Sequence, residues 1–340
     1  YWIQDNVRYI AFEDGIAGFK PDLANNVLNK KYGDCKGMAN LTCQMLKSLG
    51  FDARLCWLGT NHLAYDYSTP ALCVDNHMIC AVMQDGKPLF IDPTETYLSI
   101  ADNAERIQGR EVLIENGAEF IRYKNPDRSY NQNQEAVIKE VFLEGNDMVG
   151  KTNLMLKGES RSRFLASYHG IKSNKSEEEL LNYLSAGDAN YQVTLVKKPD
   201  LKNRNNAIDM DYSFRFKNAV SAFDGEMYLD LDHDKDFVHL TVDTLKRKSD
   251  IFFDYKYNVK HQVKLKIPLG FKLKSKPADL SIENTYYTLI ANYTEKEGYI
   301  LYNKQLTIKN THLKKEATSQ LKKDFDLLKN FYQETLTLNK

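Results

Sequence analysis

Residues 32–49 constrain the fold of this chain more than any other stretch, because a turn leads there into an amphipathic helix. Gly33 and Asp34 favour the turn, and Asp34 is also a good helix N-cap. The positions that follow recur at three- and four-residue spacing, which predicts one buried helix face. They are Met38, Ala39, Thr42, Met45, Leu46 and Leu49. The pattern therefore predicts a core helix that begins at Cys35 and ends before Gly50.

Cys35 would lie in the first turn of this helix. Unpaired backbone N–H groups and the positive end of the helix dipole favour a thiolate over a thiol at such a position. The N–H of Cys35 can also stabilise an oxyanion. A thiolate here is a nucleophile, but it needs a base and a group that orients that base.

Two later segments supply both groups. Residues 78–83 and 89–91 are predicted strands joined by an Asp-Gly turn, which is typical of a hairpin. His77 begins the first strand and Asp92 follows the second, so antiparallel pairing would bring the two side chains together. An imidazole can take the thiol proton, and a carboxylate can hold the imidazole in the required tautomer. The sequence therefore predicts a Cys35–His77–Asp92 triad.

Composition excludes several other classes of protein. At 340 residues the chain is long enough for two domains. Lys plus Arg and Asp plus Glu both number 46, so there is no electrostatic case for nucleic acid or an anionic membrane as the main partner. No apolar run reaches membrane-spanning length. Because the chain starts at Tyr1 without Met, we expect it to be a processed or excised piece.

All five cysteines lie in the first 80 residues. Their odd number leaves at least one free thiol, which suits a catalytic cysteine better than a full disulfide framework. Cys43, Cys56 and Cys80 lie in apolar segments and are predicted to be buried small hydrophobes. The absence of a CxxC pair argues against a structural zinc site. The pairing of these three and of Cys73 stays open.

The character of the sequence changes at a polar stretch around residues 125–134, which is the best domain boundary. We predict one domain over 1–125 and a second over 126–340, with an optional subdivision near 218–248. The second half consists mostly of strand-like segments and closes with an amphipathic helix in 313–340. The predicted class is α+β, with a β-rich, sandwich-like second half.

Three motifs together resemble a known family. The run KYGDCKGMANLTCQMLKSLGFDARLCWLGT, then DNHMICAV, then PLFIDPTE, is similar to the transglutaminase-like superfamily. In particular it resembles the bacterial branch with a GDCK motif, an Asn-His motif and a terminal Asp-Pro-Thr. The resemblance covers roughly residues 1–125 and implies a papain-like cysteine fold. On it, Cys35 would be the nucleophile, His77 the general base and acid, and Asp92 the orienting carboxylate.

The remainder is similar to the β-rich domains that accompany this branch in surface or periplasmic proteins of Bacteroidetes-type bacteria. The resemblance implies an extracytoplasmic location and a second, upstream side chain as oxyanion donor, for which Tyr9 is the candidate. Another β-rich domain usually precedes the core in this family. The mechanism implies no metal and no organic cofactor.

The predicted activity is acyl transfer on the amide bonds of a protein or peptide through a thioester. Hydrolysis by a peptidase or amidase is favoured, because water needs no dedicated acceptor site. The alternatives are a protein-crosslinking transglutaminase and a non-catalytic surface scaffold on the same fold. A metal site built from Cys35, His77 and Asp92 is a less well supported hypothesis than either of these alternatives. The natural substrate, the oligomeric state and the role of the second half stay open.

Three further features have ordinary explanations. His62 lies in a polar loop and is expected to be solvated. Lys36 could stabilise a neighbouring thiolate, but we expect its side chain to point to solvent. Residues 230–236 place Asp at every second position, which suggests either a calcium loop or a solvent-facing strand edge. Because the Gly and the terminal Glu of an EF-hand are missing, the strand edge is favoured.

Overall fold

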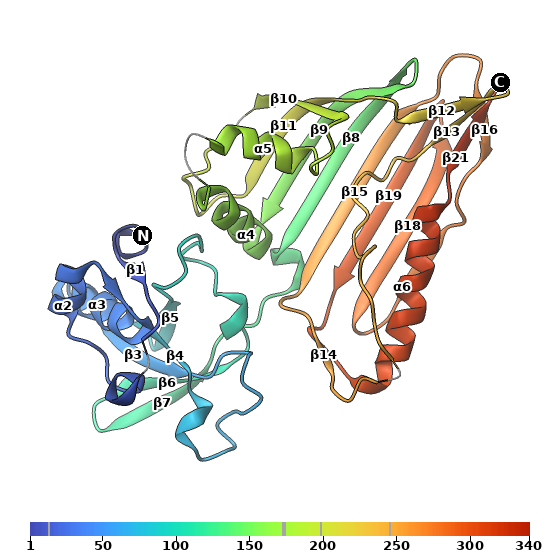
Figure 1. Ribbon diagram of the computed structural model, residues 1–340. Coiled ribbons are helices and arrows are strands. Elements are labelled where there is room, and N and C mark those ends of the chain that lie inside the picture. The colour runs from blue at the N-terminus through green and yellow to red at the C-terminus, as the bar shows by residue number, and fades with distance from the viewer. Residues whose placement is uncertain (13, 172–174, 198, 245) are drawn as a thin grey trace. The chain divides into compact units, whose positions relative to one another are not determined.

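The computed structural model describes residues 1–340 except 13, 172–174, 198 and 245 (Figure 1). The chain divides into two compact units, Tyr1–Arg128 and Ser129–Lys340. The assignment of the first unit as catalytic and the second as accessory stays a prediction.

The first unit is built on an antiparallel sheet of five strands among its described residues, in the order β5-β4-β3-β6-β7. The strands are β3 (Ala53–Leu58), β4 (His77–Gln84), β5 (Lys87–Ile91), β6 (Glu111–Asn116) and β7 (Glu119–Lys124). Helix α3 (Cys35–Ser48) packs on β3 and β4. The shorter elements are α1 (Trp2–Asn6), β1 (Arg8–Tyr9), η1 (Gly15–Gly18), α2 (Ala24–Lys30), β2 (Tyr32–Gly33), η2 (Leu72–Val74) and η3 (Glu105–Ile107).

Local sequence rules explain the elements that carry the predicted triad. The Asp34 side chain caps α3 by accepting a hydrogen bond from the Gly37 N–H at 2.8 Å, so the helix begins at Cys35 as predicted. The hairpin is also confirmed. Asp85 and Gly86 adopt positive φ angles of 49° and 75° between β4 and β5, as a tight hairpin turn requires.

The second unit is built on a large sheet, which has eight strands in the described part of the chain. Its order is β10-β11-β9-β8-β15-β19-β18-β17, and its neighbouring strands are antiparallel apart from the parallel pair β8 and β15. The strands are β8 (Gln134–Glu144), β9 (Asp147–Lys157), β10 (Tyr191–Lys197), β11 (Ile208–Phe216), β15 (Tyr257–Lys266), β17 (Leu280–Glu283), β18 (Tyr287–Lys296) and β19 (Tyr299–Ile308).

Smaller elements complete the second unit. A second sheet pairs β12 (Val220–Phe223), β13 (Glu226–Leu229), β21 (Leu336–Asn339) and β16 (Lys272–Ser275) in that order. A further pair joins β14 (Ile251–Phe252) to β20 (His312–Leu313). The helices are η4 (Tyr130–Gln132), α4 (Gly158–His169), α5 (Ser176–Leu184), η6 (Lys315–Ala317) and α6 (Thr318–Gln333).

One face of the large sheet is buried beneath other elements of this unit. Along β8, Val137 is buried while its neighbour Ile138 is exposed, which is the alternation of a sheet with one covered face. Helix α6 lies along the large sheet (Figure 1), and its Phe331 ring stacks with Tyr293 and Tyr302 of the covered face. The α+β class, the β-rich second half and the C-terminal helix are therefore confirmed.

Two details of the second unit differ from the sequence-based expectations. The closing helix ends at Gln333, because residues 335–338 alternate Thr and Leu with the period of a strand, and Leu336–Asn339 form β21. Residues 230–236 are not a solvent-facing strand edge. They follow the end of β13 as irregular chain, and Asp232 is buried.

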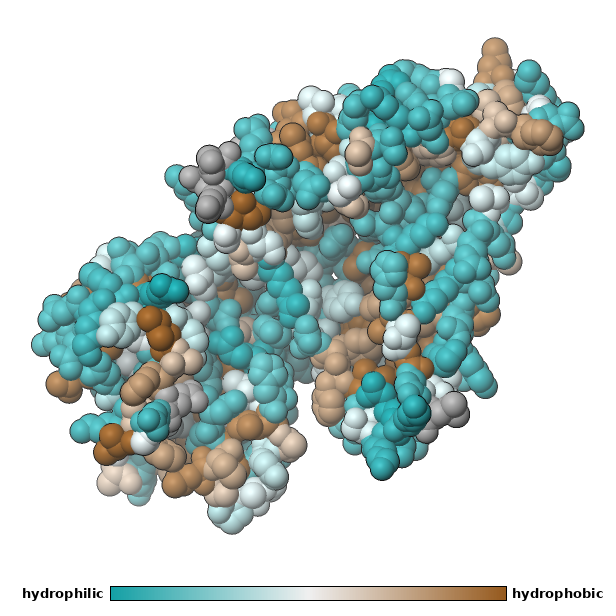
Figure 2. Space-filling view, viewed as in Figure 1, coloured by the Kyte–Doolittle hydropathy of each residue, from teal (hydrophilic) through white to brown (hydrophobic). Residues whose placement is uncertain are grey.

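The surface in view is largely hydrophilic, with apolar patches scattered over both units (Figure 2). Within the part of the chain that is described, no helix combines the length and the apolar character needed to cross a membrane.

Candidate active site

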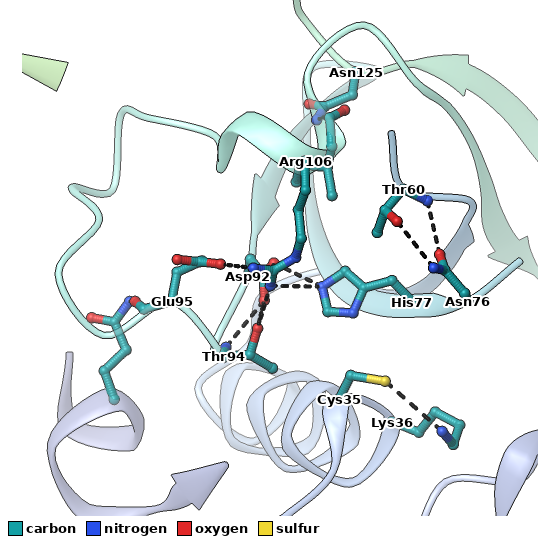
Figure 3. Close-up of polar contacts among 12 residues, drawn as sticks. Cys35, Lys36, Thr60, Asn76, His77, Asp92, Thr94, Glu95, Arg106 and Asn125 are labelled. Atoms are coloured by element: carbon teal, nitrogen blue, oxygen red, sulfur yellow. Dashed lines mark hydrogen bonds and ion pairs between the residues drawn. The ribbon is translucent and has the colours of Figure 1, made fainter. Parts of the chain in front are cut away.

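Three elements of the first unit bring the predicted triad together. Cys35 is the first residue of α3, His77 is the first residue of β4, and Asp92 directly follows β5 (Figure 3). Nε2 of His77 lies 2.8 Å from Oδ2 of Asp92. The Cys35 thiol interacts with the same imidazole and helps to raise its pKa. Because Asp92 occupies Nε2, Nδ1 is the nitrogen that remains for the thiol. The catalytic role of the three residues stays a prediction.

The three side chains form a chain of contacts and not a convergent cage. Among the described residues, these three do not form a group whose possible metal-ligand atoms all lie within 4.8 Å of one another. The imidazole instead separates the thiol from the carboxylate. This arrangement suits proton transfer along Cys35–His77–Asp92 better than metal binding.

Burial and charge together determine the protonation state of the pair. Burial alone would lower the pKa of His77, but the Asp92 carboxylate and the hydrogen bonds to Asp92 and Cys35 raise that pKa to about 9. Burial would raise the pKa of Asp92, but the charges of His77 and Arg106 and a hydrogen bond from Thr94 hold it well below its usual range. At neutral pH the site therefore contains an imidazolium beside a carboxylate.

Two residues fix the orientation of Asp92. Thr94 donates two hydrogen bonds to Oδ1, from its backbone N–H at 3.0 Å and from Oγ1 at 2.7 Å. Arg106 donates from Nη2 to Oδ2 of Asp92 at 3.1 Å and to Oγ1 of Thr94 at 2.8 Å, and it also pairs with Glu95. The carboxylate thus accepts bonds from three groups and has little freedom to rotate away from His77.

The contribution of Arg106 was not predicted from the sequence. This residue lies in η3 and reaches the site only because the loop after β5 folds back (Figure 3). The buried Asn125 donates a hydrogen bond to the Ile107 carbonyl at 2.7 Å and so holds η3 in place. Thr94 could have been identified from the sequence, because it ends the Asp-Pro-Thr motif. Arg106 could not, because it lies in no recognisable sequence pattern.

Asn76 anchors the start of β4, directly before His77. Its Oδ1 accepts the Thr60 N–H at 2.8 Å, and its Nδ2 donates to Thr60 Oγ1 at 3.0 Å. Gly59 makes this approach sterically feasible, since a Cβ there would lie 2.1 Å from the Val74 carbonyl oxygen. In the Asn-His motif, His77 therefore faces the thiol, and Asn76 fixes the strand that carries His77.

Lys36 was predicted to point to solvent, but this prediction is wrong. The residue is only 5% exposed, and its Nζ lies 2.6 Å from Oδ2 of Asp34 and 3.8 Å from Sγ of Cys35. The helix-capping carboxylate attracts the ammonium back along the helix, which places a positive charge next to the sulfur. Such a charge favours a thiolate.

The two predicted oxyanion donors occupy different environments. The N–H of Cys35 opens α3 and has no acceptor within the helix, so it can serve a ligand. Tyr9 is 43% exposed on β1, where it pairs with Gly33 of β2. Its role stays a prediction. His62 is exposed, as expected.

The remaining cysteines include one close pair. Cys43, Cys56 and Cys80 are buried, as predicted, and Cys73 is exposed. All are free thiols, although Sγ of Cys43 and Sγ of Cys80 lie only 2.8 Å apart.

Two family models match parts of the chain. Residues 1–86 match the family model of the transglutaminase-like superfamily. Residues 227–338 match a second family, described as a domain of unknown function with a solved structure (DUF3858). No curated protein sequence matches the chain significantly.

One solved structure has the same overall architecture. It is the crystal structure of a "putative protease" from Parabacteroides distasonis, with a TM-score of 0.52 and 10% sequence identity. The similarity covers 99% of this chain and 50% of that one, so the chain spans about half the length of its structural relative. At this identity the similarity shows the fold alone.

Proposed function

We propose that the protein is a cysteine acyl-transfer enzyme that hydrolyses amide bonds, as a peptidase or an amidase. The observation that carries the proposal is the contact chain Cys35–His77–Asp92, in which a buried imidazolium lies between a thiol and a carboxylate. The match to the transglutaminase-like superfamily supports the same general class of thiol chemistry.

The mechanism follows from the positions of these groups. The Cys35 thiolate attacks the amide carbonyl carbon, and the Cys35 N–H donates to the oxygen that becomes negative. His77 then gives its Nδ1 proton to the leaving amine as the C–N bond breaks, which leaves a thioester. Neutral His77 next takes a proton from water, the resulting hydroxide attacks the thioester, and the acid leaves as the thiolate returns.

A crosslinking transglutaminase is the alternative outcome of the same thioester. In that reaction a lysine amine replaces water as the second nucleophile. Hydrolysis is favoured because water needs no acceptor site, and the described residues at the triad include none that we can assign to amine binding. The extracytoplasmic location is likewise a proposal, and it rests on the resemblance of the second half to accessory domains.

One observation favours a non-catalytic scaffold instead. Cys35 is only 1% exposed, so a substrate carbonyl can reach its sulfur only after neighbouring groups move. A protein that kept the fold but not the chemistry would also tolerate a covered thiol.

The chain contains an internal reference for a test of these two functions. Cys73 is an exposed free thiol and should react as an ordinary cysteine. We would treat the protein with iodoacetamide at about pH 6, where a free thiol with a pKa near 8.5 is less than about 1% ionised. Peptide mass spectrometry would then give separate rates for Cys35 and Cys73.

The enzyme proposal predicts that Cys35 is alkylated faster than Cys73 at this pH, and that His77→Ala abolishes the difference. Slower alkylation of Cys35 than of Cys73, in both proteins, would favour the scaffold. If Cys35 is reactive, a mixed peptide library with dansylcadaverine would separate hydrolysis from transamidation. New N-termini that depend on Cys35 indicate hydrolysis, and incorporated amine indicates crosslinking.

A further inference from the structure

The aspartate-rich segment 230–236 crosses the covered face of the large sheet in the second unit. Asp232 accepts hydrogen bonds from Tyr302 Oη at 2.8 Å and from Lys304 Nζ at 2.8 Å, and both donors lie on β19. Lys304 also pairs with Asp236 at 2.9 Å. The segment is therefore held on the sheet by buried charge, and its remaining acidic groups face the polar part of that surface.

Acidic side chains outnumber basic ones on this surface. It carries four carboxyl groups, from Glu135, Asp232, Asp234 and Asp236, and two amino groups, from Lys139 and Lys304. Lys304 satisfies Asp232 and Asp236, and Lys139 lies over the rings of Tyr191 and Phe214.

Burial and the charges of Asp236 and Asp234 raise the pKa of Glu135 to about 7, although Lys304 acts in the opposite direction. Within the described residues, the carboxyl groups of Glu135 and Asp234 make no hydrogen bond or ion pair. Carboxyl groups that share a site repel each other when both are ionised, and a divalent cation would offset that repulsion.

A buried histidine with one unpartnered ring nitrogen faces the same place. His261 on β15 is 5% exposed and lies in register between Val137 of β8 and Lys304 of β19. Its Nδ1 lies 3.8 Å from Oδ1 of Asp232. Its Nε2 is buried, and no described residue offers it a hydrogen bond. Buried polar atoms normally have a partner, so this nitrogen requires an explanation.

The Asp232 contact distinguishes the two nitrogens of the ring. Nδ1 faces the carboxylate, which leaves Nε2 as the nitrogen available to a ligand. Metal-binding histidines have this arrangement, with one nitrogen on the metal and the other directed to a carboxylate.

We propose that Glu135, Asp234 and His261 bind a divalent transition-metal ion, with Zn²⁺ as the best match. One ligand atom from each of the three side chains lies within 4.8 Å of the other two. A set of one imidazole and two carboxylates suits zinc, whereas calcium and magnesium prefer oxygen alone. Glu135 and Asp234 also line a cavity of about 460 Å³, which gives the ion a path of entry and leaves a coordination position for water.

The site requires a small closure to form. Ligand atoms about 2.0–2.2 Å from a tetrahedral zinc ion are about 3.3–3.6 Å apart, so ligand atoms that lie within 4.8 Å of one another must approach by at most about 1.5 Å. The exposed Asp234 has the freedom to make this movement. The site lies wholly within the second unit and is independent of the proposed thiol chemistry.

The test is a zinc titration of the full chain with a Cys35→Ala replacement, because the thiol of the first unit could itself bind zinc. The protein would be stripped with chelator and then titrated with Zn²⁺ in competition with a chromophoric chelator. We expect one tight ion per chain. Asp234→Asn and His261→Gln should each weaken zinc binding by more than about 100-fold. Mutating a residue that only supports a ligand weakens metal binding by about 10- to 100-fold, so a larger loss indicates a direct ligand.

His239→Gln is the matched control, since His239 is an exposed histidine three residues after this segment. It should leave the affinity unchanged. Because His261 is buried and its replacement could disturb folding, the exposed Asp234 provides the decisive variant, with circular dichroism to confirm its fold. Equal zinc affinity in Asp234→Asn, loss of binding in His239→Gln, or no tight site in the parent protein would each overturn the proposal.

Discussion

Replacing Asp92 with Asn removes the charge that holds His77 in its protonated form. The pKa of His77 is raised to about 9 from an ordinary value of 6.5. This difference of 2.5 units corresponds to about 3 kcal/mol in favour of the imidazolium, at about 1.4 kcal/mol per unit. The figure is a net value, because burial and Arg106 both act in the opposite direction. Without the carboxylate charge, only those opposing effects and the Cys35 hydrogen bond remain.

We therefore expect His77 in Asp92→Asn to titrate below pH 6.5, so that the imidazole is neutral at physiological pH. Two-dimensional NMR of ring-labelled histidine would follow the titration directly. The wild-type His77 should stay charged to about pH 9 and then lose its proton. Alkylation of Cys35 at pH 6 should also slow in the variant, because the thiolate loses its cationic partner.

Asp75→Asn is the matched control for this experiment. Asp75 lies two residues before His77, but its Oδ1 accepts a hydrogen bond from Tyr67 at 2.6 Å. Its replacement removes a nearby negative charge without altering the contact between His77 and Asp92, so His77 should still titrate near pH 9. The electrostatic account would be refuted if Asp92→Asn left the His77 titration above pH 8, or if Asp75→Asn shifted it by the same amount.

Three further predictions concern other parts of the protein. Arg106→Gln should raise the pKa of His77, because the guanidinium disfavours the positive charge of the imidazole. The same NMR titration would show the His77 pKa moving upward, whereas Asp92→Asn moves it downward. Cys43 and Cys80, with sulfurs 2.8 Å apart, should form a disulfide when the chain folds with oxidised glutathione; intact-mass analysis would show a loss of two hydrogens, and retention of both thiols would contradict this. Leu328→Ala should destabilise the second unit by about 2–5 kcal/mol because the side chain is fully buried in α6, while the half-exposed Leu327→Ala should cost much less in the same thermal unfolding experiment.

Several features of the site were predictable because short-range rules produce them. The helix begins at Cys35 because Asp34 caps it, and this interaction spans only three residues. His77 and Asp92 meet because a two-residue turn pairs the strands between them. Each step needs only turn chemistry, capping and periodicity, which nearby residues determine.

Other features depend on contacts between distant parts of the chain. Arg106 reaches Asp92 only through a folded loop. Lys36 was expected in solvent, and its burial depends on the packing around the start of α3. In the second unit, Asp232 was attributed to a strand edge, although its partner Lys304 lies 72 residues away.

The sequence alone therefore determined where Cys35, His77 and Asp92 lie, because each occupies an end of an element that local rules define. Only the tertiary structure decided the charges that surround them and the polar cluster of the second unit. Electrostatic partners act through space at a few ångströms, and no periodicity or spacing in a sequence records which distant charge folding will place at that distance.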